Sequence, residues 1–346
     1  MATNLAGGTA ATDRNPCSDR TQGAIASFSS MKIFHYCRRD GVENFGDQLN
    51  LWLWPQLLPG VFHGDGSTLF VGIGTLLNHC LPGRLGHARR VVIFSTGAGY
   101  ERPLLRPLPS HWRIYCVRGP YSSNQLQLPR QMALTDGAIL LRQIFQPSGP
   151  KRVSFAWMPH IHHATYAGDT WQQICQAIGF GYIDPRWPVE KVLTAISETE
   201  VLLAEAMHGA IAADALRVPW VPVQTSARIL TVKWQDWCAS IGVEFVPQYL
   251  PPWLPGYPPV AQGVRSALKA SRYWLNCYRQ LGLIPQKVSH EAPERMAQHL
   301  LNLADTAQPY LSQERRLAEL TEQLQARLYQ VKTDIGSGIF SDSPSD

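Results

Sequence analysis

The chain has 346 residues, of which 45% are hydrophobic and 16% charged, with a formal net charge of +5. This length exceeds what one hydrophobic core usually serves, so we expect two domains of roughly 100 to 200 residues each. No stretch of about 18 uninterrupted apolar residues occurs, which excludes a transmembrane helix, and the mild charge gives no reason to expect a nucleic-acid partner.

Residues 1–30 are rich in small and polar residues and lack an apolar signal core, so they are expected to form a disordered leader, with Met31 as an alternative start. The seven cysteines contain no Cys-x-x-Cys pair. An odd number of scattered cysteines suits free thiols in a reducing compartment, and we expect a cytoplasmic protein.

The first half, expected as a Rossmann-like domain over 31–150, alternates strands with helical segments. Later strands end in glycine-containing turns, and Asp47 is a candidate N-cap for the first helix. This pattern indicates βαβ units and a parallel sheet. The expected strands are 32–36, 68–71, 91–95 and 113–117, and the expected helices are 48–58 and 139–145.

A Pro/Gly-containing run at 146–151 marks the expected domain boundary, and the pattern then repeats. We therefore expect an α/β protein with two doubly wound, Rossmann-like domains facing each other across a cleft. The second domain is expected to cover 151–260. A helical extension over 261–334 and a disordered tail over 335–346 are expected to follow it. The expected strands of the second domain are 153–157, 181–183, 201–204 and 220–223, and its expected helices are 169–178, 189–196 and 209–216.

His208 follows the apolar strand 201–204 and stands beside Gly209 at the start of a small-residue helix. Ligands of open parallel sheets bind at the carboxyl ends of the strands, where the next helix offers free N–H groups. His208 is therefore a candidate catalytic residue. The alternative is a histidine that is merely tolerated in a turn.

Two cationic side chains are candidates for binding an anion. Arg118 emerges from a strand directly before Pro120 and Ser122 of the next helix, so a guanidinium fork and helix N–H groups can hold a carboxylate or phosphate. Lys233 lies among tryptophans on an expected helix and can pair with a substrate anion. The alternatives are an interdomain salt bridge for Arg118 and simple stem packing for Lys233.

Other motifs point away from cofactors. His160 and His162 would share one face of an extended segment as two zinc ligands might, but no further ligand pair has metal spacing, so a substrate contact is favoured. The Gly72-Ile73-Gly74 turn lacks the third glycine of a dinucleotide fingerprint. Asp136 either caps the helix that follows it or points into the cleft.

The segment 264–283 combines Arg and Lys with aromatic residues. Such a helix either lies on an anionic bilayer or packs back onto the core.

Six motifs occur along the chain in a fixed order: Asn44-Phe45-Gly46-Asp47, Arg118-Gly119-Pro120-Tyr121-Ser122, Thr135-Asp136-Gly137-Ala138, Met158-Pro159-His160, Glu205-Ala206-Met207-His208-Gly209 and Lys233-Trp234-Gln235-Asp236-Trp237. Together they resemble the polysaccharide pyruvyl transferase family, in particular the branch that places pyruvate ketals on bacterial exopolysaccharides such as xanthan and succinoglycan. The resemblance spans roughly 31–259. It implies a fold like the two-domain GT-B glycosyltransferases, with phosphoenolpyruvate as donor in the cleft and no other cofactor.

The resemblance also implies site residues. His208 would be catalytic, and Arg118, Lys233 and Gly209 would bind phosphoenolpyruvate. Some relatives carry an arginine two positions before the histidine, where this chain has Ala206. The residues assigned to the acceptor or the cleft are Asn44, Asp47, Ser122, Asp136, His160 and Glu205, and no metal ligand is assigned.

The chemistry of phosphoenolpyruvate fits these residue types. Its carboxylate and phosphate need cations, and its C3 must be protonated before C2 accepts a hydroxyl, which suits histidine. His208 would act as general acid or base, Arg118 would clamp the donor, and Lys233 would offset charge on the leaving phosphate.

We expect a sugar acceptor, lipid-linked, with peripheral contact at the inner face of the plasma membrane. Two other functions remain open: a nucleotide-sugar glycosyltransferase of the same fold, and a non-catalytic sugar-binding or scaffold protein of an export complex.

Overall fold

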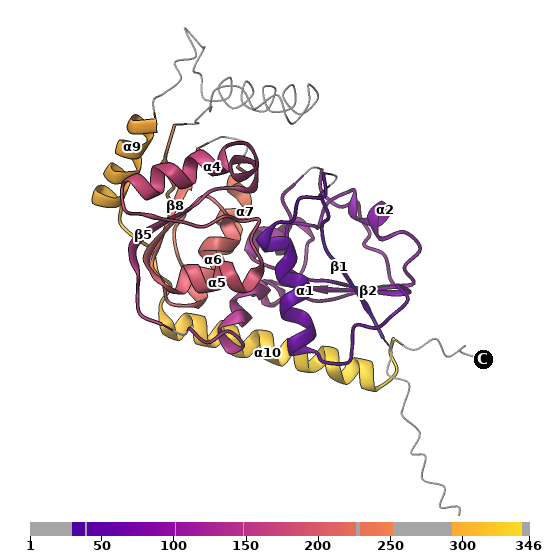
Figure 1. The fold of residues 1–346 in the computed structure, drawn as a ribbon. Helices are drawn as coiled ribbons and strands as arrows, with labels where there is room; N and C mark the ends of the chain where they lie inside the picture. Colours follow the sequence, from indigo (N-terminus) through magenta and orange to yellow (C-terminus); the bar gives the residue numbers. More distant parts are fainter. Residues whose placement is uncertain are drawn as a thin grey trace, which may run out of the picture.

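The computed structural model describes residues 30–38, 40–100, 102–147, 149–225, 229–251 and 293–340. The expected leader up to residue 29 and the basic segment 264–283 lie outside these ranges. Within them the protein is α/β, with two parallel sheets and helices packed around them (Figure 1). The α/β class expected from the sequence is thereby confirmed.

The first sheet has four parallel strands in the order β1-β2-β3-β4. All four residues of β2 are buried, as expected for a strand with neighbours on both sides. The strands are β1 (Lys32–Phe34), β2 (Thr68–Val71), β3 (Arg90–Phe94) and β4 (Trp112–Cys116). Their connections and the segment that follows contain α1 (Phe45–Leu57), α2 (Leu81–Leu85), α3 (Pro120–Gln125) and the 3₁₀ helices η1 (Arg130–Met132) and η2 (Gly137–Gln143).

The second sheet has five parallel strands in the order β6-β5-β7-β8-β9. Apolar residues at i, i+3, i+4 and i+7 give α5 one buried face. The strands are β5 (Val153–Met158), β6 (Gly181–Tyr182), β7 (Thr199–Ala204), β8 (Trp220–Gln224) and β9 (Gln248–Tyr249). The helices are α4 (Ile161–Ala177), α5 (Val189–Ser197), α6 (Met207–Ala215) and α7 (Thr231–Ile241), followed by α9 (Pro293–Thr306) and α10 (Glu314–Gly336).

Three local expectations need correction. Helix α1 begins at Phe45 after Asn44, so the prediction of Asp47 as its N-cap is wrong and Asp47 lies in the first helical turn. The apolar segment after Asp136 is a 3₁₀ helix, and Asp136 caps it by accepting a 3.0 Å hydrogen bond from the Ala138 N–H. Helix α4 begins at Ile161, which places His162 inside a helix rather than in an extended segment.

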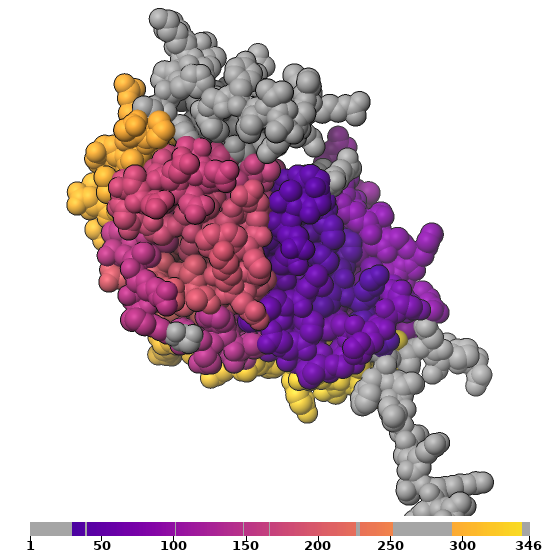
Figure 2. All heavy atoms as spheres, viewed as in Figure 1, coloured from indigo at the N-terminus to yellow at the C-terminus, as the bar shows by residue number. Residues whose placement is uncertain are grey.

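The two sheets share one hydrophobic core. A single cluster of buried side chains includes Trp54 and Phe70 from the first half, Ile211 and Trp220 from the second, and Leu324 from α10. Helix α6, formed largely of small buried residues, packs directly on η2. Figure 2 shows the two halves meeting along a continuous boundary on one face of the molecule.

Helix α10 runs along both halves (Figure 1). Near its start, Arg316 Nη2 donates a 2.8 Å hydrogen bond to the Ser240 carbonyl of the second half. Near its end, Asp334 forms a 2.8 Å ion pair with Arg113 Nε and accepts a hydrogen bond from the Tyr115 hydroxyl. Arg113 and Tyr115 both belong to β4. This helix therefore stabilises the arrangement of the two sheets.

The ordered chain extends beyond α10, where the sequence predicted a disordered tail from residue 335. Phe340 is buried, and its carbonyl accepts a 2.8 Å hydrogen bond from Arg90 Nη1. In the described part of the chain, no helix has both the length and the apolar character that a membrane span requires.

Candidate active site

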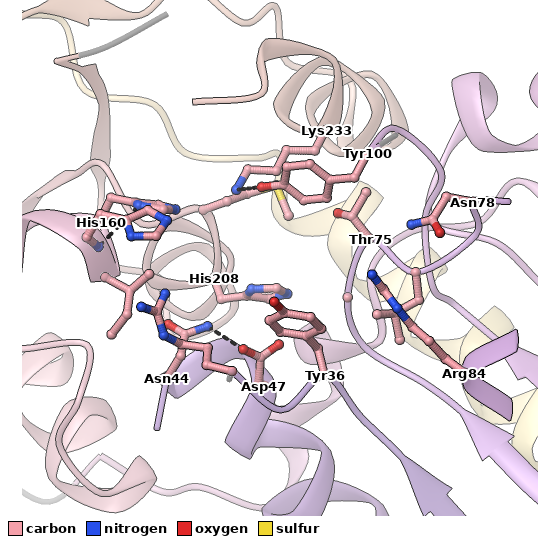
Figure 3. Close-up of a pocket in the computed structure, with 16 residues that line it drawn as sticks. Tyr36, Asn44, Asp47, Thr75, Asn78, Arg84, Tyr100, His160, His208 and Lys233 are labelled. Carbon is pink, nitrogen blue, oxygen red and sulfur yellow. Dashed lines mark hydrogen bonds between the residues drawn. The ribbon is translucent and has the colours of Figure 1, made fainter. Parts of the chain in front are cut away.

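A pocket of about 320 Å³ lies between the two halves of the protein (Figure 3). Its walls come largely from the turns that follow β1, β2, β3, β5 and β7, because all these strands run parallel and end at the same side of their sheets. The lining is rich in cationic and aromatic side chains. It consists of Tyr36, Arg38, Asn44, Asp47, Gly74, Thr75, Leu76, Asn78, Arg84, Tyr100, His160, Ile161, His162, Met207, His208 and Lys233.

His208 stands in the first turn of α6 and lines this pocket. Its Nε2 lies 3.7 Å from the Oδ2 of Asp136, and neither atom has a hydrogen-bond partner among the described residues. The opposite ring nitrogen faces Gly46, where an added Cβ would lie only 2.2 Å from Nδ1. The imidazole is thus held between a buried carboxylate and the backbone of α1, an arrangement that suits proton transfer.

Asp136 itself lies behind the pocket and does not line it. Its Oδ1 caps η2 while its Oδ2 faces His208. A fully buried carboxylate beside an imidazole fixes the orientation of the ring. Asp136 is therefore placed to position His208 rather than to contact an acceptor.

Asp47 and Asn44 both line the pocket, at the start of α1. The Asn44 amide donates a 2.9 Å hydrogen bond to Asp47 Oδ2. Burial raises the pKa of Asp47, although the Asn44 hydrogen bond and the nearby His208 act in the opposite direction. Asp47 is thus the acidic side chain of the pocket among the described residues.

Lys233, in the first turn of α7, brings a positive charge to the other side of the pocket. Only 8% of the residue is exposed, and its Nζ donates a 3.2 Å hydrogen bond to the Tyr100 hydroxyl. None of the ion pairs among the described residues includes Lys233. Its charge is therefore available to an anionic ligand.

His160 lies at the N-terminus of α4 and lines the pocket beside His162. Burial, reinforced by the charge of Lys233, lowers the pKa of His160 well below its usual value. Burial and Arg38 likewise lower the pKa of His162 to about 4. Near neutral pH these two imidazoles are uncharged and act as hydrogen-bonding groups.

Glu205 is fully buried beneath the pocket and does not line it. One of its oxygens accepts a 2.8 Å hydrogen bond from the His160 N–H and lies 2.5 Å from His163 Nδ1, and the other accepts from the Thr225 hydroxyl. Burial acts to raise the pKa of Glu205, but His163 and these hydrogen bonds outweigh it and lower the pKa. Glu205 thus ties the ends of β5, β7 and β8 together.

Arg118 and Ser122 are also completely buried and do not line the pocket. Arg118 Nε pairs with Asp236 Oδ2 at 3.1 Å, and its Nη1 donates a 2.7 Å hydrogen bond to the Thr75 hydroxyl. The same carboxylate accepts a 2.5 Å hydrogen bond from Ser122 Oγ. The buried position of Arg118 differs from the expected role as a clamp on the donor, because Asp236 of α7 neutralises the Arg118 guanidinium inside the protein.

Gly209, expected to bind the donor, also lies outside the pocket lining. A Cβ at this position would lie 2.4 Å from the Met158 sulfur. The glycine therefore permits close packing of α6 against the end of β5.

The structure brings together five of the expected site residues in the pocket: Asn44, Asp47, His160, His208 and Lys233. Sequence reasoning missed the pocket residues Tyr36, Arg38, Thr75, Asn78, Arg84 and Tyr100, and Asp236 as the partner of Arg118. Thr75 and Tyr100 follow strand-end glycine turns, which was the available signal. Within the described ranges, no group of three or more His, Cys, Asp or Glu residues could hold a metal ion.

Two comparisons with known proteins agree with one another. Residues 70–226 match the family model for polysaccharide pyruvyl transferase. The chain is also 36% identical over 245 residues to the succinoglycan biosynthesis protein ExoV of Rhizobium meliloti (strain 1021), covering 70% of this chain and 73% of the relative. The family match contains Asp136 and His208, and Lys233 follows it by seven residues.

Proposed function

The chain belongs to the polysaccharide pyruvyl transferase family and is a transferase, and from this premise we propose that its donor is phosphoenolpyruvate and its acceptor a sugar of an exopolysaccharide. The product would be a cyclic pyruvate ketal, released with inorganic phosphate. The name of the relative, which refers to succinoglycan biosynthesis, supports an exopolysaccharide as the acceptor class.

The charge distribution of the pocket supports a donor with several negative charges. Arg38, Arg84 and Lys233 line it, whereas Asp47 is its one acidic residue within the described part of the chain. Phosphoenolpyruvate carries both a carboxylate and a phosphate. Cations in a partly closed pocket favour such a ligand and offset the charge that develops as phosphate leaves.

The reaction requires two proton transfers, and the pocket contains groups able to perform them. C3 of the donor gains a proton and becomes a methyl group, while C2 forms a bond to the first sugar oxygen. The bond from C2 to the phosphate oxygen then breaks, and the second sugar oxygen takes its place. Of the two hydroxyl protons, one balances the proton on C3 and the other leaves on phosphate.

His208 is the group we assign to this proton transfer, as general acid or base. The observation that carries the assignment is its position in the pocket with Asp136 3.7 Å behind Nε2. A carboxylate behind an imidazole keeps the ring oriented toward the reacting groups. Asn44, Asp47 and His160 are proposed to contact the acceptor or shape its site.

We further propose that the two parallel sheets correspond to the Rossmann-like halves of a GT-B-like enzyme, with both substrates between them. Residues from both halves line the pocket, which supports this arrangement. We also propose a cytoplasmic location at the inner face of the plasma membrane, where the protein would meet a lipid-linked acceptor. Free thiols suit a reducing compartment such as the cytoplasm, and the free cysteines are Cys37, Cys80, Cys116, Cys175 and Cys238.

The test is to incubate purified protein with phosphoenolpyruvate and a pool of glycan acceptors and to follow phosphate release and product mass. We expect release that depends on acceptor and is abolished in His208→Ala. His111→Ala, which changes an exposed histidine outside the pocket, is the matched control. Absence of release, together with no thermal stabilisation by phosphoenolpyruvate, would contradict the proposal.

A further inference from the structure

The cationic side chains around the pocket are not equivalent. Arg38 is neutralised by Asp40, to which it donates hydrogen bonds of 3.0 and 2.6 Å. Arg118 is neutralised by Asp236 beneath the pocket floor. Among the ion pairs of the described residues none contains Arg84 or Lys233, and both of these side chains line the pocket. Within the described ranges, Arg84 and Lys233 are therefore pocket cations that have no ion-pair partner.

Arg84 lies at the end of the short helix α2, beside Tyr36. Its guanidinium carbon is 5.7 Å from the centre of the Tyr36 ring, close enough for a cation–π contact that orients it. Figure 3 shows Arg84 next to Tyr36 and on the same side of the pocket as Thr75 and Asn78, away from His160.

Thr75 and Asn78 add hydrogen-bond donors to this side of the pocket. The Thr75 hydroxyl accepts a hydrogen bond from Arg118, so its own hydrogen is available to a different acceptor. The Asn78 Oδ1 accepts from the Cys80 N–H at 3.0 Å, which leaves its NH₂ group to donate. A guanidinium, a hydroxyl and an amide that all donate form a site suited to a planar anion.

We propose that Arg84, Thr75 and Asn78 bind the carboxylate of the donor and Lys233 binds its phosphate, an inference that rests on phosphoenolpyruvate being the donor. Arg118 then acts as a positioning residue, because it orients Thr75 from beneath without touching the substrate. The carboxylate remains in the ketal product while phosphate leaves, so each half of the site holds a different product.

This division can be tested by calorimetry with three probes: phosphoenolpyruvate, pyruvate and inorganic phosphate. Arg84→Gln is expected to weaken phosphoenolpyruvate binding roughly 10- to 100-fold, the usual value of a charged hydrogen-bond pair. It should weaken pyruvate binding as well and leave the Kd for phosphate unchanged. Lys233→Gln should weaken the binding of phosphate and leave the Kd for pyruvate unchanged.

Arg102→Gln is the matched control, since Arg102 is exposed and does not line the pocket. Thr75→Ser, which keeps the hydroxyl, should retain pyruvate binding, whereas Thr75→Val should lose it. Two outcomes would overturn the inference, provided that the wild-type protein binds phosphoenolpyruvate. One is an unchanged affinity of Arg84→Gln for phosphoenolpyruvate. The other is that Arg84→Gln loses affinity for pyruvate and for phosphate to the same extent. Failure of the wild-type protein to bind phosphoenolpyruvate would instead overturn the proposed function.

Discussion

Replacing Asp236 by asparagine tests whether Arg118 is a buried structural residue or a donor clamp. The two side chains are each 0% exposed, and Asp236 accepts hydrogen bonds from Arg118 Nε and from the N–H and hydroxyl of Ser122. Asparagine has nearly the same shape but no charge. The guanidinium of Arg118 would therefore remain buried without its counter-ion.

The expected loss of stability follows from this burial. Removing one partner of a buried ion pair costs about 3–5 kcal/mol, because the other charge is left uncompensated. An unfolding entropy of about 2.1 cal/mol/K per residue gives roughly 0.7 kcal/mol/K for 346 residues. Asp236→Asn should therefore lower the Tm by about 4–7 °C.

Thermal unfolding followed by circular dichroism measures this shift. Glu319→Gln is the matched control, because Glu319 pairs at 3.0 Å with Arg315 on the surface, where the side chains are 43% and 90% exposed. Its Tm should change by no more than about 1 °C. If Asp236→Asn has the same Tm as the wild-type protein, the Arg118–Asp236 pair is not the buried structural ion pair that we describe, and our reasoning is refuted.

Three further changes probe the site. Gly46→Ala would place a Cβ 2.2 Å from His208 Nδ1, so phosphate release should fall roughly 100-fold, whereas Gly336→Ala, with open space around it, should not change the rate. Asp136→Asn keeps the helix cap but removes the negative charge beside His208. At saturating donor, kcat should fall at least about 100-fold with little change in Tm. A kcat equal to that of the wild-type protein would exclude the orienting role of Asp136. Burial and Arg38 lower the pKa of His162 to about 4 in the folded protein. As the pH falls below 6.5, the His162 imidazole is therefore protonated in the unfolded chain before it is protonated in the folded protein. The free energy of unfolding should drop by roughly 2 kcal/mol between about pH 7.5 and pH 5 because of this group. Denaturation curves of His162→Gln should lack this part of the pH dependence.

Local patterns predicted much of the secondary structure. The apolar run 68–71 forms β2 with those bounds, and His208 lies at the start of α6 as the strand–turn–helix pattern indicated. These features depend on neighbouring residues alone. The start of α1 was misplaced because Asn44 and Asp47 are both good capping residues and the sequence does not distinguish them.

Residue type and strand-end position also placed five candidate residues in the pocket, since parallel strands bring their following turns to one side of a sheet. The same rule could not separate side chains that enter the pocket from side chains that lie beneath it. Arg118 follows its strand as a ligand-binding arginine would, yet its partner Asp236 is 118 residues away in α7. Helix α7 reaches it because Gly119 has no side chain, and a Cβ there would lie 2.1 Å from the Asp236 carbonyl oxygen.

The sequence by itself thus determined the α/β class, the parallel strand-end pattern and the position of His208 at a helix start, because each depends on short-range periodicity and turn chemistry. Only the tertiary structure decided which cations are neutralised and which are open to a ligand. That distinction depends on contacts such as Arg118 with Asp236 and Arg38 with Asp40, and on the absence of such a pair for Arg84 among the described residues. A charge is compensated by whatever packing brings within about 4 Å, and the order of residues along the chain does not specify that distance.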